Sequence, residues 1–302
     1  MSESIRRFTS IHELMKELDM GSPSHPLITV IDASKMAYGE DVVGIKFTSD
    51  MYCISLKDGS CGMEYGRNTY DFNDGVLSFW APDQVLTMLK PQALDEVQGW
   101  LLYFHANLIR NTSLGQKMDA YSFFDYDVHE ALHLSDKEQA VLTDLVELIR
   151  QELAERIDNH SQQVLVSNLE LMLNYCTRFY ERQFNTRSSH HKDVLAKVEW
   201  LLKEYYRSNQ IIEHGQPTIQ YLAEECHLSP SYLSDLLKKE TGRSAKDHIN
   251  DFLVEKAKNL LLSSDDSVSE IAYSLGFNYP HYFTRLFKAK TGYTPVEFRQ
   301  VN

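Results

Sequence analysis

The chain has few cysteines, and they lack the spacing of a metal site or a disulfide framework. Only four occur in 302 residues. None forms a C-x-x-C pair, and no histidine cluster lies at zinc-finger spacing. We expect free thiols, as in a reducing compartment, with a disulfide between Cys53 and Cys61 as the alternative. The four cysteines are Cys53, Cys61, Cys176 and Cys226.

Long hydrophobic runs are also missing. No apolar stretch approaches the roughly 18 residues that a membrane-spanning helix needs. The first 20 residues carry scattered charges and no continuous apolar segment, which does not fit a signal peptide. Apolar residues make up 43% of the chain and charged residues 24%, as in ordinary globular proteins. We therefore expect a cytoplasmic protein without a membrane partner and, from its length, at least two domains.

An excess of positive charge, the usual sign of a nucleic-acid binder, is absent too. The formal net charge is −13. Its distribution is uneven, because residues 192–302 hold 14 Lys and Arg against 15 Asp and Glu, whereas residues 1–191 hold 16 against 28. The acidity belongs to the N-terminal part, and the C-terminal part is near neutral. The overall charge therefore does not exclude a DNA-binding domain at the C-terminal end.

Residues from about 25 to 110 have the pattern of an all-β domain. The short apolar runs LITVI, VVGIKF, VLSFW and GWLLYF are separated by turn signals such as Asp58-Gly59. Within VVGIKF, apolar residues alternate with others from Val43 to Phe47, as in a half-buried strand. Several short strands at close spacing predict a small barrel or sandwich.

The periodicity changes near residue 135. Ser135 and Glu138 form a capping box, the signature of a helix start. Apolar residues then recur at helical spacing through two segments, separated by a polar break at residues 158–161. This pattern predicts two antiparallel helices whose apolar stripes are buried on the β-domain or on a partner subunit. The polar residues 185–192 are the expected linker.

From residue 193 the pattern is helical and contains an internal repeat. Residues 218–242, TIQYLAEECHLSPSYLSDLLKKETG, align with residues 267–292, SVSEIAYSLGFNYPHYFTRLFKAKTG, after a one-residue insertion. The matched pairs are Ala223 and Ala272, Leu228 and Phe277, Pro230 and Pro280, Tyr232 and Tyr282, Leu233 and Phe283, Leu237 and Phe287, Lys238 and Lys288, Thr241 and Thr291, and Gly242 and Gly292.

Each copy predicts a helix, a tight turn and a second helix. The shared alanine lets two helices cross closely, and Gly276 can adopt the positive φ of a sharp turn. The shared proline suits the first turn of the second helix, and the shared glycine suits its C-terminal cap. In a helix-turn-helix unit, this second helix enters the major groove of DNA.

The spacer between the two copies is itself helical by pattern. Residues 244–262 carry apolar side chains at helical spacing over 19 residues. Such a helix is about 28 Å long at 1.5 Å per residue, and one turn of B-DNA is about 34 Å. A single rigid chain can therefore present two recognition helices to successive major grooves.

The segment SEIAYSLGFNYPHYFTRLFKAKTGYTPVEFR resembles the signature of AraC/XylS-type transcription regulators. The resemblance extends through both helix-turn-helix units. The N-terminal half resembles the family's cupin-like effector domain more loosely, through GWLLYFHANL and the acidic SFFDYD. The signature positions are Ile271-Ala272, Gly276-Phe277, Tyr282-Phe283, Phe287-Lys288, Gly292, Thr294-Pro295 and Phe298-Arg299.

This resemblance implies an α+β multidomain protein. A cupin-like effector-binding β-barrel is expected at residues 1–130, an antiparallel helix pair for dimerisation with its linker at 131–187, and the double helix-turn-helix domain at 188–302. The implied function is sequence-specific regulation of transcription. The expected partners are an operator in double-stranded DNA, a second copy of the chain, a small-molecule effector and RNA polymerase. No cofactor, no metal and no enzymatic activity are expected.

The DNA-contacting residues follow from the faces that the core leaves free. In each second helix, positions near its start that point away from the core can reach base edges, and the family's base-contacting positions fall on the same residues. The expected base contacts are Ser231, Ser234, Asp235, His281, Thr284 and Arg285. Basic side chains and helix N-termini can hold phosphates. The expected phosphate contacts are Thr218, Lys238, Lys239, Arg243, Ser267, Ser269, Lys288 and Lys290.

Other readings remain as alternatives. His129, Glu130 and His133 spell the H-E-x-x-H motif of zinc hydrolases, but the helix start at Ser135 places the motif outside a helix. A metal-binding cupin needs a cluster of histidines, and the expected barrel offers few. His105 is only a weak candidate for effector binding. A helix-turn-helix protein that acts mainly through protein partners is the remaining alternative.

Overall fold

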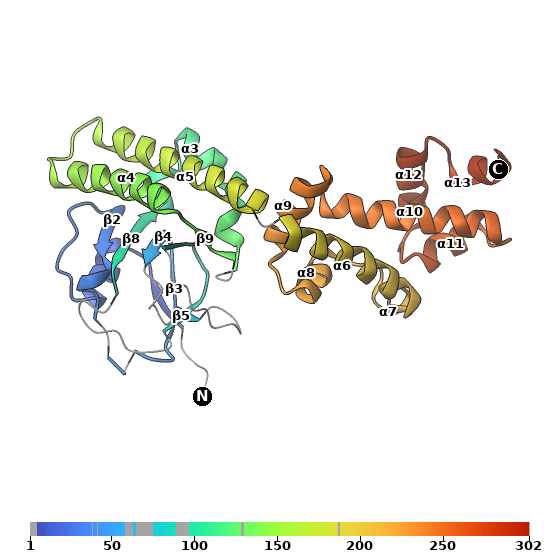
Figure 1. Cartoon of the computed structure of the whole chain (residues 1–302), viewed down its shortest axis with the longest axis horizontal. Coiled ribbons are helices and arrows are strands. Elements are labelled where there is room, and N and C mark those ends of the chain that lie inside the picture. Colours follow the sequence, from blue (N-terminus) through green and yellow to red (C-terminus); the bar gives the residue numbers. More distant parts are fainter. Residues whose placement is uncertain are drawn as a thin grey trace. The chain divides into compact units, whose positions relative to one another are not determined.

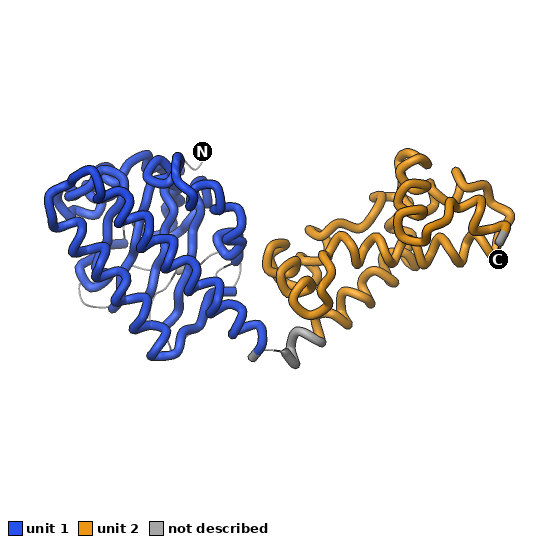
Figure 2. The backbone as a smooth tube through the Cα atoms, turned by 90° about the horizontal axis from the view of Figure 1, so that it is seen from above, with its two compact units in different colours: residues 1–186 blue, residues 187–302 orange. Residues whose placement is uncertain are grey.

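The computed structural model describes residues 5–37, 39, 40, 42–57, 63, 64, 75–88, 97–127, 130–186 and 188–301. The chain divides into two compact units, residues 1–186 and residues 187–302 (Figure 2). Within the described ranges, no helix is both long and apolar enough to cross a membrane. The α+β class is confirmed, with sheets in the first unit and helices throughout the second.

The first unit contains two sheets. The larger one is antiparallel, and its strands follow the order β2 (Ile28–Asp32), β8 (Gly99–His105), β4 (Met51–Lys57), β6 (Val76–Trp80) and β9 (Leu132–His133). The smaller one has the order β1 (Arg6–Phe8), β3 (Lys46–Ser49), β7 (Leu86–Met88) and β5 (Met63–Glu64). Buried side chains from β2, β4, β6, β8 and helix α1 (Ile11–Glu17) form a common core.

The predicted strands are confirmed where an apolar run is mostly buried. LITVI, VLSFW and GWLLYF correspond to β2, β6 and β8. VVGIKF is different, because Gly44 has a φ of +80° in a turn and the strand begins only at Lys46. Val43, Ile45 and Phe47 are all partly exposed rather than alternately buried. The turn expected at residues 58–59, and Cys61, lie outside the described residues.

A helix pair lies against the larger sheet, as the periodicity predicts. α4 (Asp136–Ala154) starts at the expected capping box and packs on β2, and α5 (Ser161–Thr186) runs beside it (Figure 1). Between them, Asp158 Oδ1 accepts hydrogen bonds from the backbone N–H groups of His160 and Ser161 at 2.7 and 3.0 Å, which closes the turn. Two short helices, α2 (Ala106–Ile109) and α3 (Ser113–Lys117), follow β8.

The second unit is entirely helical. It contains α6 (Ser188–Arg207), α7 (Gln210–His214), α8 (Ile219–Cys226), α9 (Pro230–Thr241), α10 (Ala245–Ser263), α11 (Val268–Ser274), α12 (Pro280–Thr291) and α13 (Pro295–Val301). α6 begins inside the segment that the sequence treated as a linker. Figure 1 shows α10 as the long central helix, with α8 and α9 towards one end and α11, α12 and α13 towards the other.

Candidate nucleic-acid interface

Both repeats form the helix-turn-helix units that the sequence predicts. α8 and α9 make the first helix-turn-helix unit, and α11 and α12 make the second helix-turn-helix unit. Ala223 and Ala272 are fully buried where the paired helices meet. Pro230 and Pro280 begin α9 and α12, and Gly242 and Gly292, at φ of +72° and +83°, end them.

The two turns are built from different residues. Gly276 has a φ of +75°, as expected for a sharp reversal. At the equivalent place in the first unit, His227 adopts a φ of +58°, which a residue with a side chain rarely takes. In the first helix-turn-helix unit, contacts with surrounding residues therefore hold this turn, because the backbone of His227 does not prefer that conformation.

α10 is a 19-residue helix, as predicted, and its two ends are closed by side chains. Ser244 and Asp247 form a capping box at the start. At the other end, the Arg299 guanidinium donates hydrogen bonds to the carbonyl oxygens of Leu261 and Asp266 at 2.9 and 2.8 Å. The last arginine of the AraC-like signature thus fixes the path from α10 into α11.

On α9 the three predicted base-contacting residues are partly exposed, while the opposite face is buried. Ser234 Oγ donates a hydrogen bond to the Pro230 carbonyl oxygen at 2.7 Å, so its lone pairs point outward as acceptors. Ser231 and Asp235 lie beside it on the same partly exposed face. This short, polar surface can accept hydrogen bonds from the amino groups of cytosine or adenine.

On α12 the predicted residues lie together at the start of the helix. His281 and Arg285 are exposed, and Thr284 Oγ1 donates to the Pro280 carbonyl oxygen at 3.1 Å. The Arg285 guanidinium lies 5.6 Å from the centre of the Tyr282 ring, and the His281 ring lies 4.2 Å from it. Tyr282 is 49% exposed and therefore belongs to this surface, although the sequence pattern indicated it only as a repeat and signature position.

The two repeats differ in the exposure of this tyrosine. Its repeat partner in the first helix-turn-helix unit, Tyr232, is only 4% exposed. Nothing in the spacing of the repeat distinguishes the two positions. The sequence therefore did not predict Tyr282, or the exposed Tyr279 that lies 6.0 Å from it, as surface aromatics.

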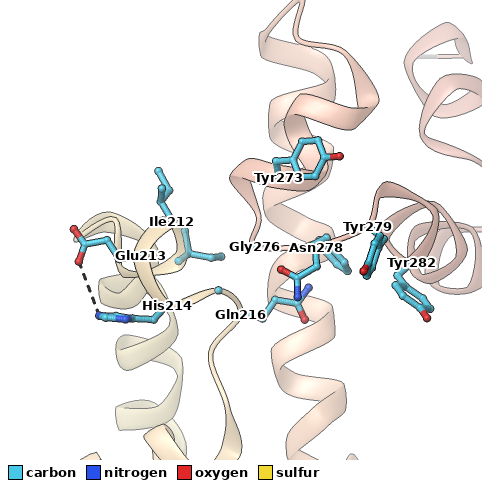
Figure 3. Close-up of a pocket in the computed structure, with 12 residues that line it drawn as sticks. Ile212, Glu213, His214, Gln216, Tyr273, Gly276, Asn278, Tyr279 and Tyr282 are labelled. Carbon is cyan, nitrogen blue, oxygen red and sulfur yellow. Dashed lines mark ion pairs between the residues drawn. The ribbon is translucent and has the colours of Figure 1, made fainter.

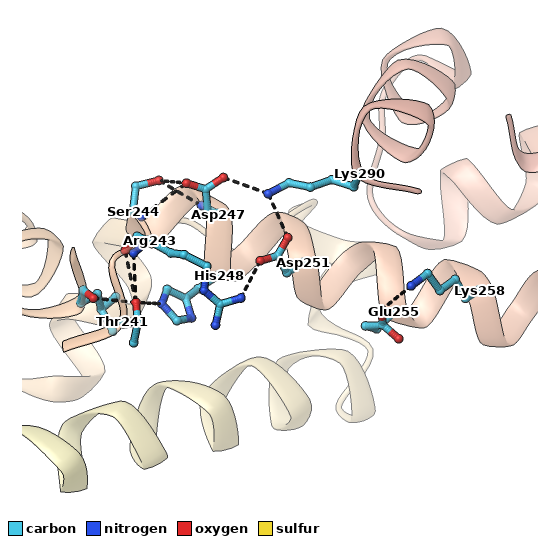
Figure 4. A network of polar contacts seen from close by, with 10 residues as sticks. Thr241, Arg243, Ser244, Asp247, His248, Asp251, Glu255, Lys258 and Lys290 are labelled. Atoms are coloured by element: carbon cyan, nitrogen blue, oxygen red, sulfur yellow. Dashed lines mark hydrogen bonds and ion pairs between the residues drawn. The ribbon is translucent and has the colours of Figure 1, made fainter. Parts of the chain in front are cut away.

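The predicted phosphate contacts fall into two groups. Lys238, Lys239 and Lys288 are exposed, and none of them makes an ion pair with any described residue. Arg243 and Lys290 instead converge on Asp251 of α10, at 2.9 Å each, and Lys290 also lies 3.0 Å from Asp247 (Figure 4). The charges of these two side chains are therefore partly offset by aspartates of the same domain.

This ion cluster joins the ends of both recognition helices to α10. Hydrogen bonds from Ser244 and Lys290 hold the pKa of Asp247 at about 2, below its usual 3.8. Close to the cluster, burial and then the charge of Arg243 lower the pKa of His248. His248 Nε2 lies 2.8 Å from Thr241 Oγ1, which itself donates to the Leu237 carbonyl oxygen at 2.7 Å. The imidazole is thus the donor to the threonine hydroxyl.

The expected helix N-termini are formed. Thr218 accepts a hydrogen bond from the Tyr221 N–H at 3.1 Å at the start of α8. Ser267 and Glu270 make a capping box at the start of α11, where Ser269 is exposed. The Glu270 carboxylate occupies the Ser267 N–H, so this end of α11 offers fewer free donors than the sequence suggested.

The described residues of the alternative sites in the first compact unit take part in local structure. His129 lies outside them, while Glu130 is buried and accepts a hydrogen bond from the Asp127 N–H at 2.8 Å. His133 belongs to strand β9, so this part of the H-E-x-x-H motif is not helical. His105 Nδ1 accepts from the Asn107 N–H at 3.0 Å and caps α2. In the described part, no three His, Cys, Asp or Glu side chains gather to hold a metal.

Comparison with known proteins agrees with this geometry. Residues 222–300 match the family model of a helix-turn-helix domain. The bifunctional transcriptional activator/DNA repair enzyme AdaA of Bacillus subtilis is 35% identical over 112 residues, which cover 36% of this chain and 52% of AdaA. The uncharacterized HTH-type transcriptional regulator YobQ of the same organism is 38% identical over 122 residues, covering 39% of this chain and 51% of YobQ.

A solved structure matches the same region. The C-terminal domain of the two-component response regulator yesN from Fusobacterium nucleatum is 32% identical, with a TM-score of 0.31, and the match covers 35% of this chain and 98% of that domain. The chain spans about half the length of the first two curated relatives. The second compact unit thus contains a helix-turn-helix domain similar to those of transcription regulators, and its sequence signature resembles that of the AraC/XylS type.

Proposed function

We propose that this chain is a sequence-specific transcription regulator whose second unit reads two successive major grooves of one DNA duplex. The observation that carries this proposal is the pair of matched helix-turn-helix units held by the single helix α10. Each unit presents polar side chains on the exposed start of its second helix, which is where a recognition helix meets base edges. One chain then reads two half-sites without help from a second protomer.

The second helix-turn-helix unit, α11 and α12, carries the side chains better suited to distinguish bases. Arg285 is exposed at the start of α12 and can donate two hydrogen bonds to O6 and N7 of guanine. His281 lies about one helical turn before it, Thr284 directly precedes it in the chain, and both can contact the neighbouring bases. On α9, Ser231 and Ser234 offer shorter side chains, and Asp235 can accept from cytosine N4. We therefore expect the half-site read by α12 to carry more of the sequence preference.

Selection of bound duplexes from a random DNA library by the full chain tests this function. Wild-type protein should enrich a site with two half-sites about one helical turn apart. Arg285→Ala should lose about 1–3 kcal/mol of discrimination at one guanine and relax the preference there. Arg156→Ala removes the same charge from the exposed end of the helix pair in the first unit and should leave the enriched sequence unchanged.

Two other results would contradict the proposal. Enrichment of no sequence would favour the alternative, in which the helix-turn-helix units act mainly through protein partners. An unchanged base preference in both Arg285→Ala and Thr284→Ala would show that α12 does not read the bases. In that case, the assignment of base-contacting residues fails even if the chain still binds DNA.

The first unit is proposed to be a cupin-like effector domain. Its two sheets enclose a core that includes Trp80 and Tyr103. A small cavity of about 90 Å³ lies beside Tyr103 and Phe47, with the ion-paired Arg6 and Glu17 among its lining. This volume is below the roughly 300–1,000 Å³ of typical small-molecule sites, so the proposed effector role rests on the resemblance to the cupin-like domain and not on this cavity. No enzymatic role is proposed for this unit.

The outer face of the helix pair is proposed to be the dimer interface. Leu148 of α4 is 48% exposed, and Leu171 of α5 is 45% exposed. Val164 precedes Leu171 by seven residues and is also exposed, so the two lie on one stripe of α5. Contact with RNA polymerase and a cytoplasmic location follow from the proposed role in transcription.

A further inference from the structure

α10 is not the only segment that joins the two helix-turn-helix units. α6 packs on α8 and α9 of the first helix-turn-helix unit. α7, which directly follows α6, packs on α11 of the second helix-turn-helix unit. Asn209, with a φ of +60°, makes the sharp turn between α6 and α7. The segment from Gln210 to Pro217, here called the strap, therefore leaves one unit, touches the other and returns to Thr218 at the start of α8.

The strap is anchored to the first helix-turn-helix unit through Tyr205 of α6. The Tyr205 hydroxyl donates a hydrogen bond to the Gly215 carbonyl oxygen at 3.3 Å. Tyr205 is buried, and its ring makes an edge contact with Tyr221 of α8 at 4.8 Å between centroids. Gly215 has a φ of +79° and a ψ of −156°, a backbone conformation that is open essentially to glycine alone. The path of the strap is therefore specified by particular residues.

In the second helix-turn-helix unit, the strap lies directly on the turn between α11 and α12. A Cβ atom added to Gly276 would be 2.8 Å from Gln216 N and from Gly215 C. Such contacts leave no room for a side chain, so the two backbones touch at this point. Beside this contact, α7 and the residues from Tyr273 to Tyr282 line an open hollow of about 850 Å³ (Figure 3). The turn that starts α12 is thus held from both α10 and the strap.

We infer that the strap is a positioning element that sets the spacing and rotational phase between the two recognition helices. A single helix fixes a distance, but each unit can still rock about it. A second attachment away from the α10 axis, at Gly276, resists that motion. Since one base pair changes the phase between half-sites by about a tenth of a turn, a braced domain accepts a narrow range of spacings. This inference rests on the proposed reading of two half-sites.

Two adjacent isoleucines of α7 give a matched test. Ile211 is 2% exposed and Ile212 is 67% exposed, so the same change to serine either loosens the strap or leaves it packed. The duplex selected by wild-type protein is compared with duplexes whose half-sites are moved by one base pair in either direction. The measured quantity is the ratio of affinities for the selected and the shifted spacing, obtained with the full chain.

We expect Ile211→Ser to reduce this ratio by about fivefold or more, the lower end of coupling between two sites. The Ile212→Ser ratio should stay within about twofold of wild type, the size of a neutral surface change. Gly215→Val is the second variant, because it displaces the strap without leaving a cavity. It decides the question if Ile211→Ser does not fold, as judged by thermal unfolding.

A wild-type ratio in every folded variant that displaces the strap would overturn the inference, while the proposed function would stand. If wild-type protein selects no site with two half-sites, the proposed function fails first and the inference with it. If Ile212→Ser lowers the ratio as much as Ile211→Ser, α7 contacts DNA rather than positioning the second unit, and the inference is wrong.

Discussion

At the scale of single residues, charge alone does not identify the groups that hold DNA. Lys288 and Lys290 lie two residues apart in α12, and both were predicted to contact phosphate. The structure separates them, because Lys290 lies 3.0 Å from Asp247 and 2.9 Å from Asp251. Lys288 has no ion pair among the described residues. Their contributions to DNA binding should therefore differ, although the sequence gives them equal standing.

Replacing each lysine by methionine tests this difference. For Lys288→Met we expect the slope of log affinity against log salt concentration to shrink by about 0.9, the effect of one lost phosphate contact. For Lys290→Met we expect a smaller change in slope, because its charge is already paired. Affinity measured at several salt concentrations for both variants decides it. Equal changes in slope would mean that Lys290 leaves its aspartates when DNA binds.

His248 gives a second prediction at this scale, on stability. Burial lowers the pKa of His248 in the folded chain. The unfolded chain therefore binds a proton at this histidine below about pH 6.5, whereas the folded chain binds it only at lower pH. The neutral imidazole therefore contributes stability above that pH, and the contribution is lost as the pH falls. The equivalent residue of the second repeat is Phe298, which packs on Phe287 at 5.4 Å between ring centroids.

The variant His248→Phe takes this substitution from the chain itself. Between pH 7.5 and 5, the free energy of unfolding of the second unit should fall less steeply in the variant than in wild type. Urea unfolding at several pH values measures the two slopes. Parallel slopes would show that His248 keeps its ordinary pKa in the folded chain and would contradict the assignment.

At the scale of elements, the sequence predicted those features that local chemistry determines. The capping box at Ser135, the spacer helix predicted over residues 244–262 and found as Ala245–Ser263, and the proline and glycine boundaries of α9 and α12 are all confirmed. Each depends on side chains within a few residues of the backbone they cap. The strap was not predicted, because its path depends on contacts between segments about 60 residues apart, such as Gly215 and Gly276.

The same distinction applies to the candidate site. The sequence located the recognition helices and the faces that carry His281, Thr284 and Arg285. It did not predict that Tyr232 is buried while Tyr282 is exposed, since the two tyrosines occupy matched positions of the repeat. It also did not predict the pairing of Arg243 with Asp251, eight residues along the chain. Periodicity identifies an element and its buried face, but not which neighbour covers the other face.

At the scale of the whole molecule, the charge distribution implies that residues 1–186 contribute to DNA affinity by bringing two copies together. Residues 192–302 are near neutral, and in the ion cluster on α10 the aspartates offset part of the charge of Arg243 and Lys290. One domain alone should then bind DNA weakly and with few phosphate contacts. Two copies on one operator would compensate, because the second copy binds at a high effective concentration.

The proposed dimer face of α4 and α5 gives the last prediction. Leu148→Glu with Leu171→Glu places one charge on an exposed position of each helix without disturbing the buried faces of α4 and α5. The variant should be monomeric by ultracentrifugation and bind the selected operator about a hundredfold more weakly, the lower end of the gain from bivalence. Val85→Glu adds a charge to an exposed residue of the same unit and should keep the wild-type mass and affinity. A variant that is monomeric but binds at wild-type affinity would show that a single second unit suffices, and the near-neutral charge would then need no compensation from a partner.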